Sequence, residues 1–204
     1  MKRFFHLFPF FLLMLLAGIL VQSCGDGNVS DSPVKTVKSY SHTVATDWNL
    51  LFLDVERHAP GYRPGPAPRA LAHLGLAAYE ACVPGMPDYN SLANLFPGLS
   101  IPAADADEYY WPEVVNASYG YLIPRFFPHV SNDLKQKMAV LEAANESKFL
   151  AETTPKIFER SKKRGQDVAA AVWEWSTTDT YGHDAYKDPF SDYDWQANYK
   201  KVGD

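Results

Sequence analysis

The sequence predicts an all-α protein, an incomplete bundle of about five helices joined by long Pro-rich loops. In several segments, apolar residues recur every three or four positions, as they do on the buried face of an amphipathic helix. Two Pro-rich stretches, 60–68 and 84–107, separate these segments. Strand-like alternation is weak throughout and no internal repeat is visible. The helical domain is expected to cover residues 45–180.

Residues 1–23 are expected to be a lipoprotein signal peptide. Two basic residues, Lys2 and Arg3, precede an almost wholly apolar run over 7–21, which is shorter than the roughly 20 residues of a membrane-spanning helix. The run ends in Val21-Gln22-Ser23-Cys24, which looks like a bacterial lipobox with Cys24 as the lipidated residue. A small residue is more usual at the position of Gln22. A plain secretory signal or an uncleaved anchor is therefore the alternative.

Lipidation of Cys24 would attach the protein to a membrane without spanning it. The expected location is the bacterial cell envelope, at the periplasmic side or the outer membrane. Residues 24–44 are expected to form a flexible tether. Loss of Lys2 and Arg3 makes the chain two charges more negative than its formal −5, so nucleic acid is not an expected partner. An acylated Cys24 leaves Cys82 without a disulfide partner, and we expect Cys82 to be buried.

The first predicted helix follows Thr46 or Asp47, either of which is a suitable cap. Its apolar positions have a spacing of 3.6 residues, and they are Trp48, Leu51, Phe52 and Val55. Four prolines and two glycines in 60–68 end this helix.

The second helix is expected to begin at Pro68, because a residue in the first turn needs no N–H donor. We expect Leu71, Gly75, Ala78 and Cys82 to line its packed face. Together with Ala72, the small residues would let another helix approach closely. The stretch 84–107 that follows is expected to wrap the surface or to contact something outside the chain. Its large apolar residues could pack it down, and they are Tyr89, Leu92, Leu95, Phe96 and Leu99.

Three further helices are predicted. The first runs from Pro112 to Ile123 and is ended by Pro124. Ser131 caps the next, which should bury Leu134, Met138, Leu141 and Phe149 and leave Lys135, Lys137, Glu142 and Glu146 in water. The last begins at Thr154-Pro155 and should pack through Phe158, Ser161, Gly165, Val168, Val172 and Trp175. Residues 181–204 are expected to be an irregular acidic and aromatic tail where the chain is truncated.

Two stretches carry a family resemblance. The first is Trp48-Asn-Leu-Leu-Phe-Leu-Asp54-Val-Glu56-Arg57, followed after the turn by Pro68-Arg69-Ala-Leu-Ala72-His73-Leu-Gly-Leu-Ala-Ala78-Tyr79-Glu80-Ala81. The second is Gly165-Gln-Asp-Val-Ala169-Ala-Ala-Val-Trp173-Glu-Trp175-Ser-Thr-Thr-Asp179. Together they resemble the N-terminal helical half of bacterial vanadium-dependent haloperoxidase-like proteins, within the type 2 phosphatidic acid phosphatase superfamily.

The resemblance implies a site that holds vanadate or phosphate among basic groups and main-chain N–H donors. The family's marks are a Lys with an Arg-Pro pair, a Pro-Ser-Gly-His turn, and a later Arg and His. No residue here matches them. Gly182-His183 lies in an acidic stretch, and the basic run Lys162 to Arg164 has no following Pro and is expected to be a solvated helix face. We therefore assign no catalytic, cofactor-binding or metal-binding residue, and vanadate is implied only for a full-length haloperoxidase.

The matching residues are interpreted as framework. Trp48 is expected to anchor the core, and Arg69 to bridge to Asp54 or Glu56. For Glu80, a framework role is preferred over a direct catalytic role. Four potential metal ligands, Glu56, His58, His73 and Glu80, lack the Glu-x-x-His spacing of a di-metal bundle. The acidic residues Asp188, Asp192 and Asp194 lack the spacing of a calcium loop.

The expected function is that of an N-terminal fragment of a lipid-anchored haloperoxidase-like or acid-phosphatase-like protein, inactive alone. Its partner would be a missing C-terminal catalytic half or a second copy in a homodimer. The alternative is a non-catalytic surface lipoprotein that binds glycan or a protein through exposed aromatic residues. The aromatic residues in apparent loops are Tyr109, Tyr110, Trp111, Tyr181, Tyr186, Tyr193, Trp195 and Tyr199.

Overall fold

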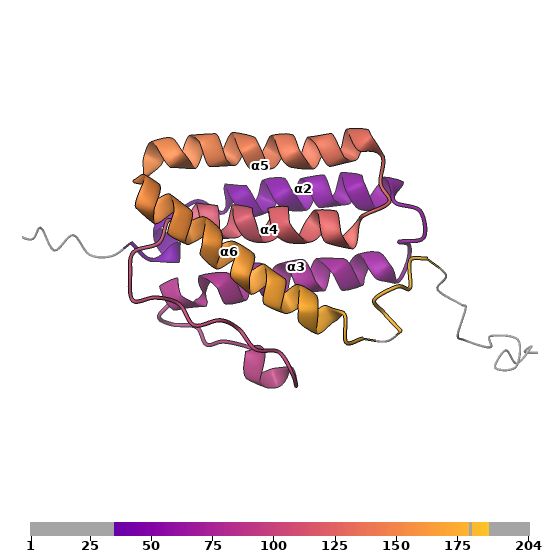
Figure 1. The fold of residues 1–204 in the computed structure, drawn as a ribbon, viewed down its shortest axis with the longest axis horizontal. Coiled ribbons are helices and arrows are strands. Elements are labelled where there is room, and N and C mark those ends of the chain that lie inside the picture. The colour runs from indigo at the N-terminus through magenta and orange to yellow at the C-terminus, as the bar shows by residue number, and fades with distance from the viewer. Residues whose placement is uncertain (1–34, 180, 188–204) are drawn as a thin grey trace, which may run out of the picture. The chain divides into compact units, whose positions relative to one another are not determined.

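The computed structural model describes residues 35–179 and 181–187, where the chain forms α-helices and short 3-10 helices and no strand. The α-helices are α2 (Thr43–His58), α3 (Pro66–Cys82), α4 (Trp111–Phe126), α5 (Asn132–Glu152) and α6 (Pro155–Ser176); the 3-10 helices are η1 (Val37–Ser39), η2 (Val83–Gly85) and η3 (Ala93–Leu95). The predicted all-α class is confirmed (Figure 1). None of the described helices is long and apolar enough to cross a bilayer. The predicted signal peptide (1–23), the predicted lipidation site Cys24 and the residues beyond Lys187 lie outside the described residues.

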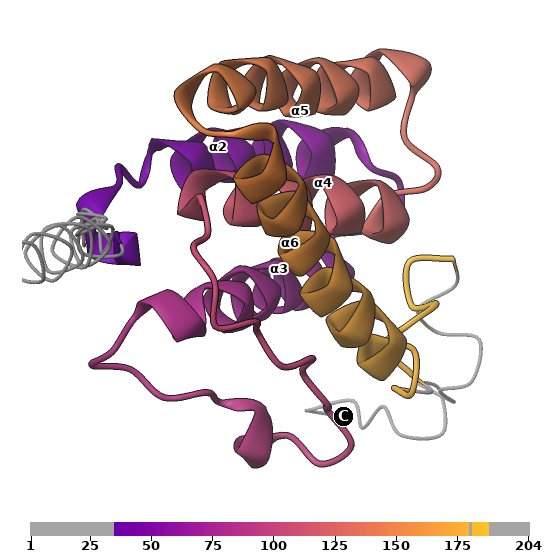
Figure 2. The same ribbon diagram turned by 60° about the vertical axis from the view of Figure 1, so that its left-hand side comes forward.

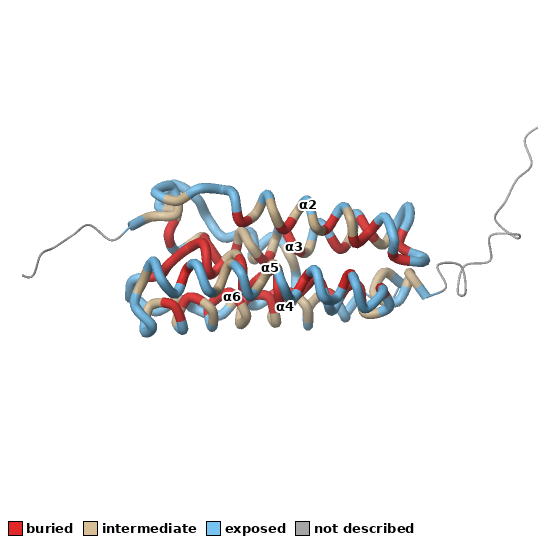
Figure 3. Tube along the Cα trace, turned by 90° about the horizontal axis from the view of Figure 1, so that it is seen from above, coloured by how far each residue is buried: buried red, intermediate tan, exposed pale blue. Residues whose placement is uncertain are grey.

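Helix α4 is the centre of the bundle. Helices α2, α3, α5 and α6 all pack against it, and α6 runs obliquely across α4 and α3 (Figure 1). Most residues of α4 are buried on every side of the helix, whereas α2 and α6 alternate buried and exposed positions (Figure 3). A helix that is apolar almost all round belongs in a core, and the other helices each need only one apolar face.

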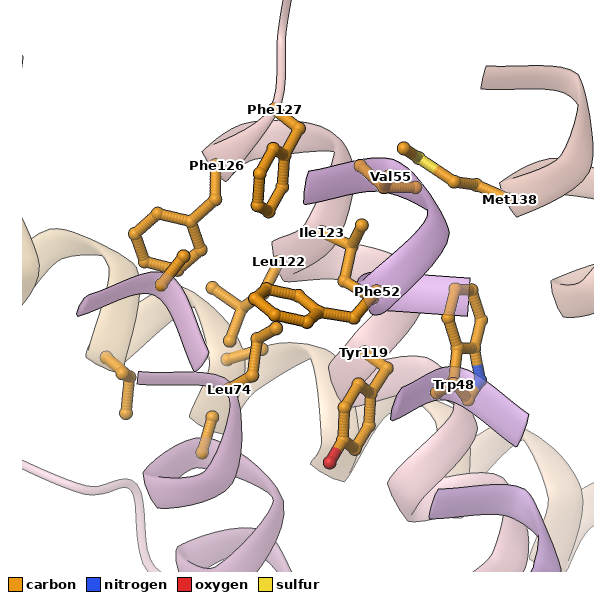
Figure 4. Close-up of a cluster of buried hydrophobic side chains, with 14 of the residues drawn as sticks. Trp48, Phe52, Val55, Leu74, Tyr119, Leu122, Ile123, Phe126, Phe127 and Met138 are labelled. Carbon is orange, nitrogen blue, oxygen red and sulfur yellow. The ribbon is translucent and has the colours of Figure 1, made fainter. Parts of the chain in front are cut away.

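The main core forms where α2, α3 and α4 meet (Figure 4). The fully buried Trp48 ring stacks on Tyr119 with centroids 6.1 Å apart, and its indole N–H donates to Asn116 Oδ1 at 2.9 Å. Phe52 packs edge-on against Phe127. The predicted role of Trp48 as a core anchor is confirmed, because the ring is buried and its one donor is satisfied.

Two predicted helix starts are confirmed by their caps. Ser131 Oγ accepts a hydrogen bond from Leu134 N–H at the start of α5, and Thr154 Oγ1 accepts one from Ile157 N–H at the start of α6. The predicted cap of α2 at Thr46 or Asp47 is wrong, since the helix begins at Thr43. Residues 35–44, expected in the tether, include the first residues of α2, and Trp111 Nε1 donates to Lys35 O at 2.9 Å.

The predicted packed face of α3 is wrong. Its core-facing positions are Ala67, Ala70, Leu74, Ala77 and Ala81, while Leu71 is 41% exposed and Gly75 lies in solvent. The predicted face and the observed face of α3 are offset by about one residue along the helix. Both carry apolar residues, so the apolar periodicity of the sequence could not distinguish them. Cys82 is buried, as expected.

Helix α4 continues past Pro124 to Phe126, so the predicted stop is wrong. Phe127 N–H bonds to Ile123 O at 3.0 Å, and the Tyr62 hydroxyl bonds to Phe126 O. The Phe126 ring is buried against Trp173. Tertiary packing at this end therefore outweighs the hydrogen bond that proline removes.

The connection between α3 and α4 makes a wide excursion beside α3 (Figure 2). Of its apolar residues, Leu99 is buried and Phe96 partly so, while Tyr89 and Leu95 are largely exposed. Several hydrogen bonds hold the excursion, among them Trp175 Nε1 to Pro97 O at 3.0 Å. It is a surface wrap tied to the helices at separate points.

Candidate functional site

A cavity of about 410 Å³ opens at the end of the bundle where the α2–α3 loop meets the segment after α6. We call it the arginine cavity. It is lined by Gly61, Arg63, Pro64, Gly65, Pro66, Arg69, Gly182 and Ala185. Gly61 has a φ of +80°, and a Cβ there would strike the carbonyl of Tyr186. The two loops therefore approach closely beside the cavity, and its arginines make it the natural place to seek an oxyanion site.

Arg69 is already neutralised. Its Nε donates to Asp179 Oδ2 at 2.9 Å and its Nη2 donates to Ser176 O at 2.6 Å. Burial raises the pKa of Asp179, but hydrogen bonds from Gly182 N–H and Arg69 outweigh it and hold this pKa below its usual value. The predicted bridge from Arg69 to Asp54 or Glu56 is wrong. Arg69 instead ties α3 to the segment that follows α6.

Arg63 is neutralised as well. It makes a two-pronged ion pair with Glu56, with Nε donating to Oε2 at 2.7 Å and Nη2 donating to Oε1. The hydrogen bond from Arg63 lowers the pKa of the Glu56 carboxyl, and burial opposes this shift. Each cavity arginine thus faces a carboxylate that stays ionised at neutral pH.

The first turn of α3, beside the cavity, offers no free main-chain donor. Pro66 and Pro68 have no N–H. The N–H of Ala67 bonds to Tyr62 O at 2.8 Å, and that of Arg69 bonds to Gly65 O at 3.4 Å. A helix N-terminus binds anions through such free N–H groups, and here they are missing or already used.

His183 lies at the same end of the bundle, with its ring edge-on to Trp173 at 5.2 Å. Its Nδ1 is buried and has no hydrogen-bond partner. Asp179 and Asp184 are close in sequence, and Arg69 and Arg125 line the same small pocket as His183. Arg69 is paired with Asp179, and Arg125 donates to Tyr121 O at 2.7 Å, so both cations already bond to the protein. The charged groups of this region therefore favour a structural role over the binding of vanadate or phosphate.

A third arginine, Arg164, joins distant segments of the chain. Its guanidinium donates to Glu80 O at 3.1 Å, to Ala81 O at 3.4 Å and to Pro102 O. Only 6% of the residue is exposed. The predicted solvated face is therefore wrong for Arg164 and for the half-buried Lys162, whereas Lys163 between them is open to solvent. A cation at the last carbonyls of α3 also complements the helix dipole.

Glu80 is a structural residue. It is 1% exposed, and its carboxylate accepts hydrogen bonds from Ser91 Oγ at 2.8 Å and Leu92 N–H at 2.6 Å. Tyr79 beside it donates its hydroxyl to Asn90 O at 2.7 Å. Both side chains hold the α3–α4 connection against α3.

The four potential metal ligands are not brought together. His58 Nδ1 lies 2.8 Å from Asp54 O, and His73 Nδ1 lies 2.7 Å from Arg69 O. Burial lowers the pKa of His73. Glu56 and Glu80 make the separate contacts described above. Within residues 35–179 and 181–187, no group of three or more His, Cys, Asp or Glu side chains could hold a metal ion.

Three of the aromatic residues expected in exposed loops are buried. Tyr109, Tyr110 and Trp111 are between 3% and 8% exposed, because they close the bundle where α4 begins. Tyr186 stacks on Tyr62, and Tyr181 is 79% exposed. Tyr193, Trp195 and Tyr199 lie outside the described residues. The described aromatics do not form a shared sugar-stacking surface.

Sequence reasoning missed a buried polar cluster between α4, α5 and α6. We define it as Glu113, Asn116, Glu142, Asn145, Glu146 and Lys162. Lys162 forms an ion pair with Glu146 at 2.7 Å, and both are half-buried. The prediction that Glu142 and Glu146 face water is therefore wrong. Glu142 follows the buried Met138 by four positions, and Glu146 precedes the buried Phe149 by three. Positions three and four apart share a helix face, so this spacing could have shown that both glutamates lie on the packed side of the helix.

No protein-family model matches the chain, and no curated protein sequence matches it. Among solved structures, the chain is similar to one described as "Crystal structure of the first bacterial vanadium dependant iodoperoxidase". The sequences are 22% identical and the TM-score is 0.57, over 79% of this chain and 35% of that chain. The chain thus spans about a third of the length of that protein. At this identity the comparison establishes a shared helical, haloperoxidase-like fold.

Proposed function

We propose that this chain is a supporting helical layer of a vanadium haloperoxidase-like protein of the type 2 phosphatidic acid phosphatase superfamily. In this proposal the chain corresponds to the N-terminal helical half. The residues that bind vanadate or phosphate lie on a further stretch of polypeptide. The chain alone has neither haloperoxidase nor phosphatase activity.

One observation carries the proposal: the described helices match about a third of an iodoperoxidase chain, and their conspicuous cations have structural partners. Arg63 and Arg69 are paired with carboxylates, and Arg164 holds main-chain carbonyls. An oxyanion site needs cations and N–H donors that are directed at the ligand rather than at the protein.

The test has two arms. The purified chain should neither oxidise iodide or bromide with peroxide and vanadate, nor release phosphate from an aryl phosphate. The DNA beyond codon 204 should encode an Arg-Pro pair and a Pro-Ser-Gly-His turn, and co-expression of that segment should restore one of the two activities. Activity of the chain alone would overturn the proposal, as would an inactive complex with the downstream segment.

We further propose that Cys24 is lipidated and holds the protein in the bacterial cell envelope. The lipobox-like Val21-Gln22-Ser23-Cys24 supports this, because acylation needs a cysteine at the end of a short apolar signal. Labelled palmitate should enter the wild-type chain and leave the Cys24→Ser variant unlabelled. Equal labelling of both chains would contradict the assignment.

A further inference from the structure

Helix α5 is held to the bundle in an unusual way. Its fully buried residues are Leu134, Met138 and Phe149, which lie towards the two ends of the helix. Between them, the face turned to α4 and α6 carries Glu142, Asn145 and Glu146. In the middle of α5, only Leu141 adds apolar packing, and the buried polar cluster makes the other contacts.

The charges of the buried polar cluster do not balance. Glu113 on α4 faces Glu142 and Glu146 on α5 and Lys162 on α6. The ammonium of Lys162 pairs with Glu146 at 2.7 Å and makes no ion pair with Glu113 within the described residues. The other nearby titratable group is Tyr110, whose hydroxyl donates to Glu152.

Glu113 has only one weak hydrogen bond to support a negative charge. The residue is fully buried, Oε2 accepts from Asn116 Nδ2 at 3.3 Å, and Oε1 has no partner. The Asn116 side chain also accepts from Trp48 Nε1 on α2 and from Asn145 Nδ2 on α5. A buried carboxylate without a cation or several donors is costly, whereas a protonated carboxyl is not.

Helix α5 packs closely against α4 at Gly120. The Glu142 carboxylate lies directly over Gly120 of α4, where any Cβ would strike it. Glu142 is itself half-buried, and burial followed by the charge of Glu146 raises its pKa. Carboxylates from α4 and α5 are thus held close together by the docking itself.

We propose that Glu113 carries a proton while α5 is docked, and that losing this proton loosens α5 from α4 and α6. The cluster is then a pH-sensitive latch on one helix of the bundle. The inference uses contacts within the chain alone, so it does not depend on the proposed enzymatic role.

The direction of the pH effect follows from the pKa of Glu113. Burial, and then the charge of Glu146, raise this pKa from 4.5 to about 8. The docked state therefore binds a proton that the undocked chain releases. Its stabilisation is complete at low pH and is lost progressively as pH rises towards 8. Between pH 6 and 8 the opening equilibrium constant should rise by up to about tenfold per pH unit.

The experiment measures hydrogen-exchange protection factors along the full chain from pH 6 to 9, corrected for the intrinsic exchange rate. In the wild type, α5 amides should lose protection with rising pH before those of α4 and α6 do. The Glu113→Gln variant, which mimics the protonated acid, should keep α5 protected across this range. The matched control is Glu159→Gln, an exposed carboxyl on α6, which should behave as the wild type does.

Two results would overturn the latch. The first is an α5 protection profile that does not change with pH in the wild type, or that changes equally in the Glu113→Gln variant. The second applies even if that variant does not fold. Infrared spectra of the wild type should show a protonated carboxyl band at neutral pH that disappears by about pH 9.5, beyond the raised pKa. Absence of this band rejects the resident proton.

Discussion

At the residue scale, the Arg164 side chain on α6 links the end of α3 to the α3–α4 connection. One guanidinium bonds to Glu80 O and Ala81 O at the end of α3 and to Pro102 O in the α3–α4 connection. Glu80 and Ala81 are buried, whereas Pro102 is exposed. Removing the Arg164 side chain would leave buried acceptors unpaired, which costs more than the net gain from forming such bonds.

We expect Arg164→Met to lower the free energy of unfolding by about 2–4 kcal/mol, because up to three charge-assisted hydrogen bonds are lost. Urea unfolding monitored by circular dichroism measures this loss. The control is Lys163→Met, since the Lys163 side chain is 74% exposed and pairs only with Asp167 on its own helix. That change should stay within about 0.5 kcal/mol. Equal effects of the two substitutions would show that the Arg164 contacts contribute nothing.

The sequence predicted the structural roles of single residues correctly where one property of the side chain determines the role. The size of Trp48 marked a core anchor, the hydroxyl of Ser131 marked a helix cap, and Thr154-Pro155 marked a helix start; the structure confirms all three. Sequence reasoning misplaced Arg164 because a Lys-Lys-Arg run looks the same whether or not its last member turns inward. Which carbonyls lie within reach of Arg164 depends on α3 and residue 102, far away in the sequence.

At the scale of elements, two glycines inside helices, Gly165 and Gly75, differ in how closely a neighbouring helix approaches them. Helices α4 and α6 approach most closely at Gly165, where an added Cβ would fall against Val114 O and 2.9 Å from Ala117 Cβ. An added Cβ at Gly75 of α3 would meet nothing within 4 Å. Gly165 is therefore required by packing within the chain, and Gly75 is not.

The two substitutions should have opposite effects on the melting temperature. Gly165→Ala should destabilise the protein by about 1–3 kcal/mol, because a backbone carbonyl cannot move aside cheaply. Gly75→Ala should stabilise it by about 0.4–1 kcal/mol, because alanine restricts the unfolded chain and favours the helix. Differential scanning calorimetry of both variants measures this contrast. Destabilisation by Gly75→Ala would mean that another surface approaches α3 there.

The helices themselves were largely predictable, but the faces they bury were less so. Helix α6 packs through the predicted Phe158, Gly165 and Val172, because its other side is charged. Helix α3 has apolar residues all round, so its face depends on where α4 and α6 lie. Helix α5 turns Glu142 and Glu146 inward, against the usual pattern, where Lys162 pairs with the Glu146 carboxylate and Asn116 Nδ2 donates to the backbone carbonyl of Glu142. Such exceptions depend on tertiary neighbours that periodicity does not reveal.

At the scale of the whole molecule, the two stretches that carry the family resemblance meet in space at two places. Arg69 of the first pairs with Asp179 of the second, and Arg164, next to the second, bonds to Glu80 O of the first. These contacts hold the two stretches together within one helical fold.

This arrangement predicts how the molecule responds to oxyanions. With the formal net charge at −5 and both cavity arginines paired, 1 mM vanadate or phosphate should leave the melting temperature unchanged relative to chloride at equal ionic strength. Occupancy of a specific site at 100 times its Kd would add about 2.7 kcal/mol. The Asp179→Asn variant leaves the Arg69 guanidinium uncompensated, so phosphate should stabilise that variant more than chloride does. Stabilisation of the wild type by vanadate at this concentration would instead mean that these helices hold an oxyanion themselves, and the supporting role proposed for them would be wrong.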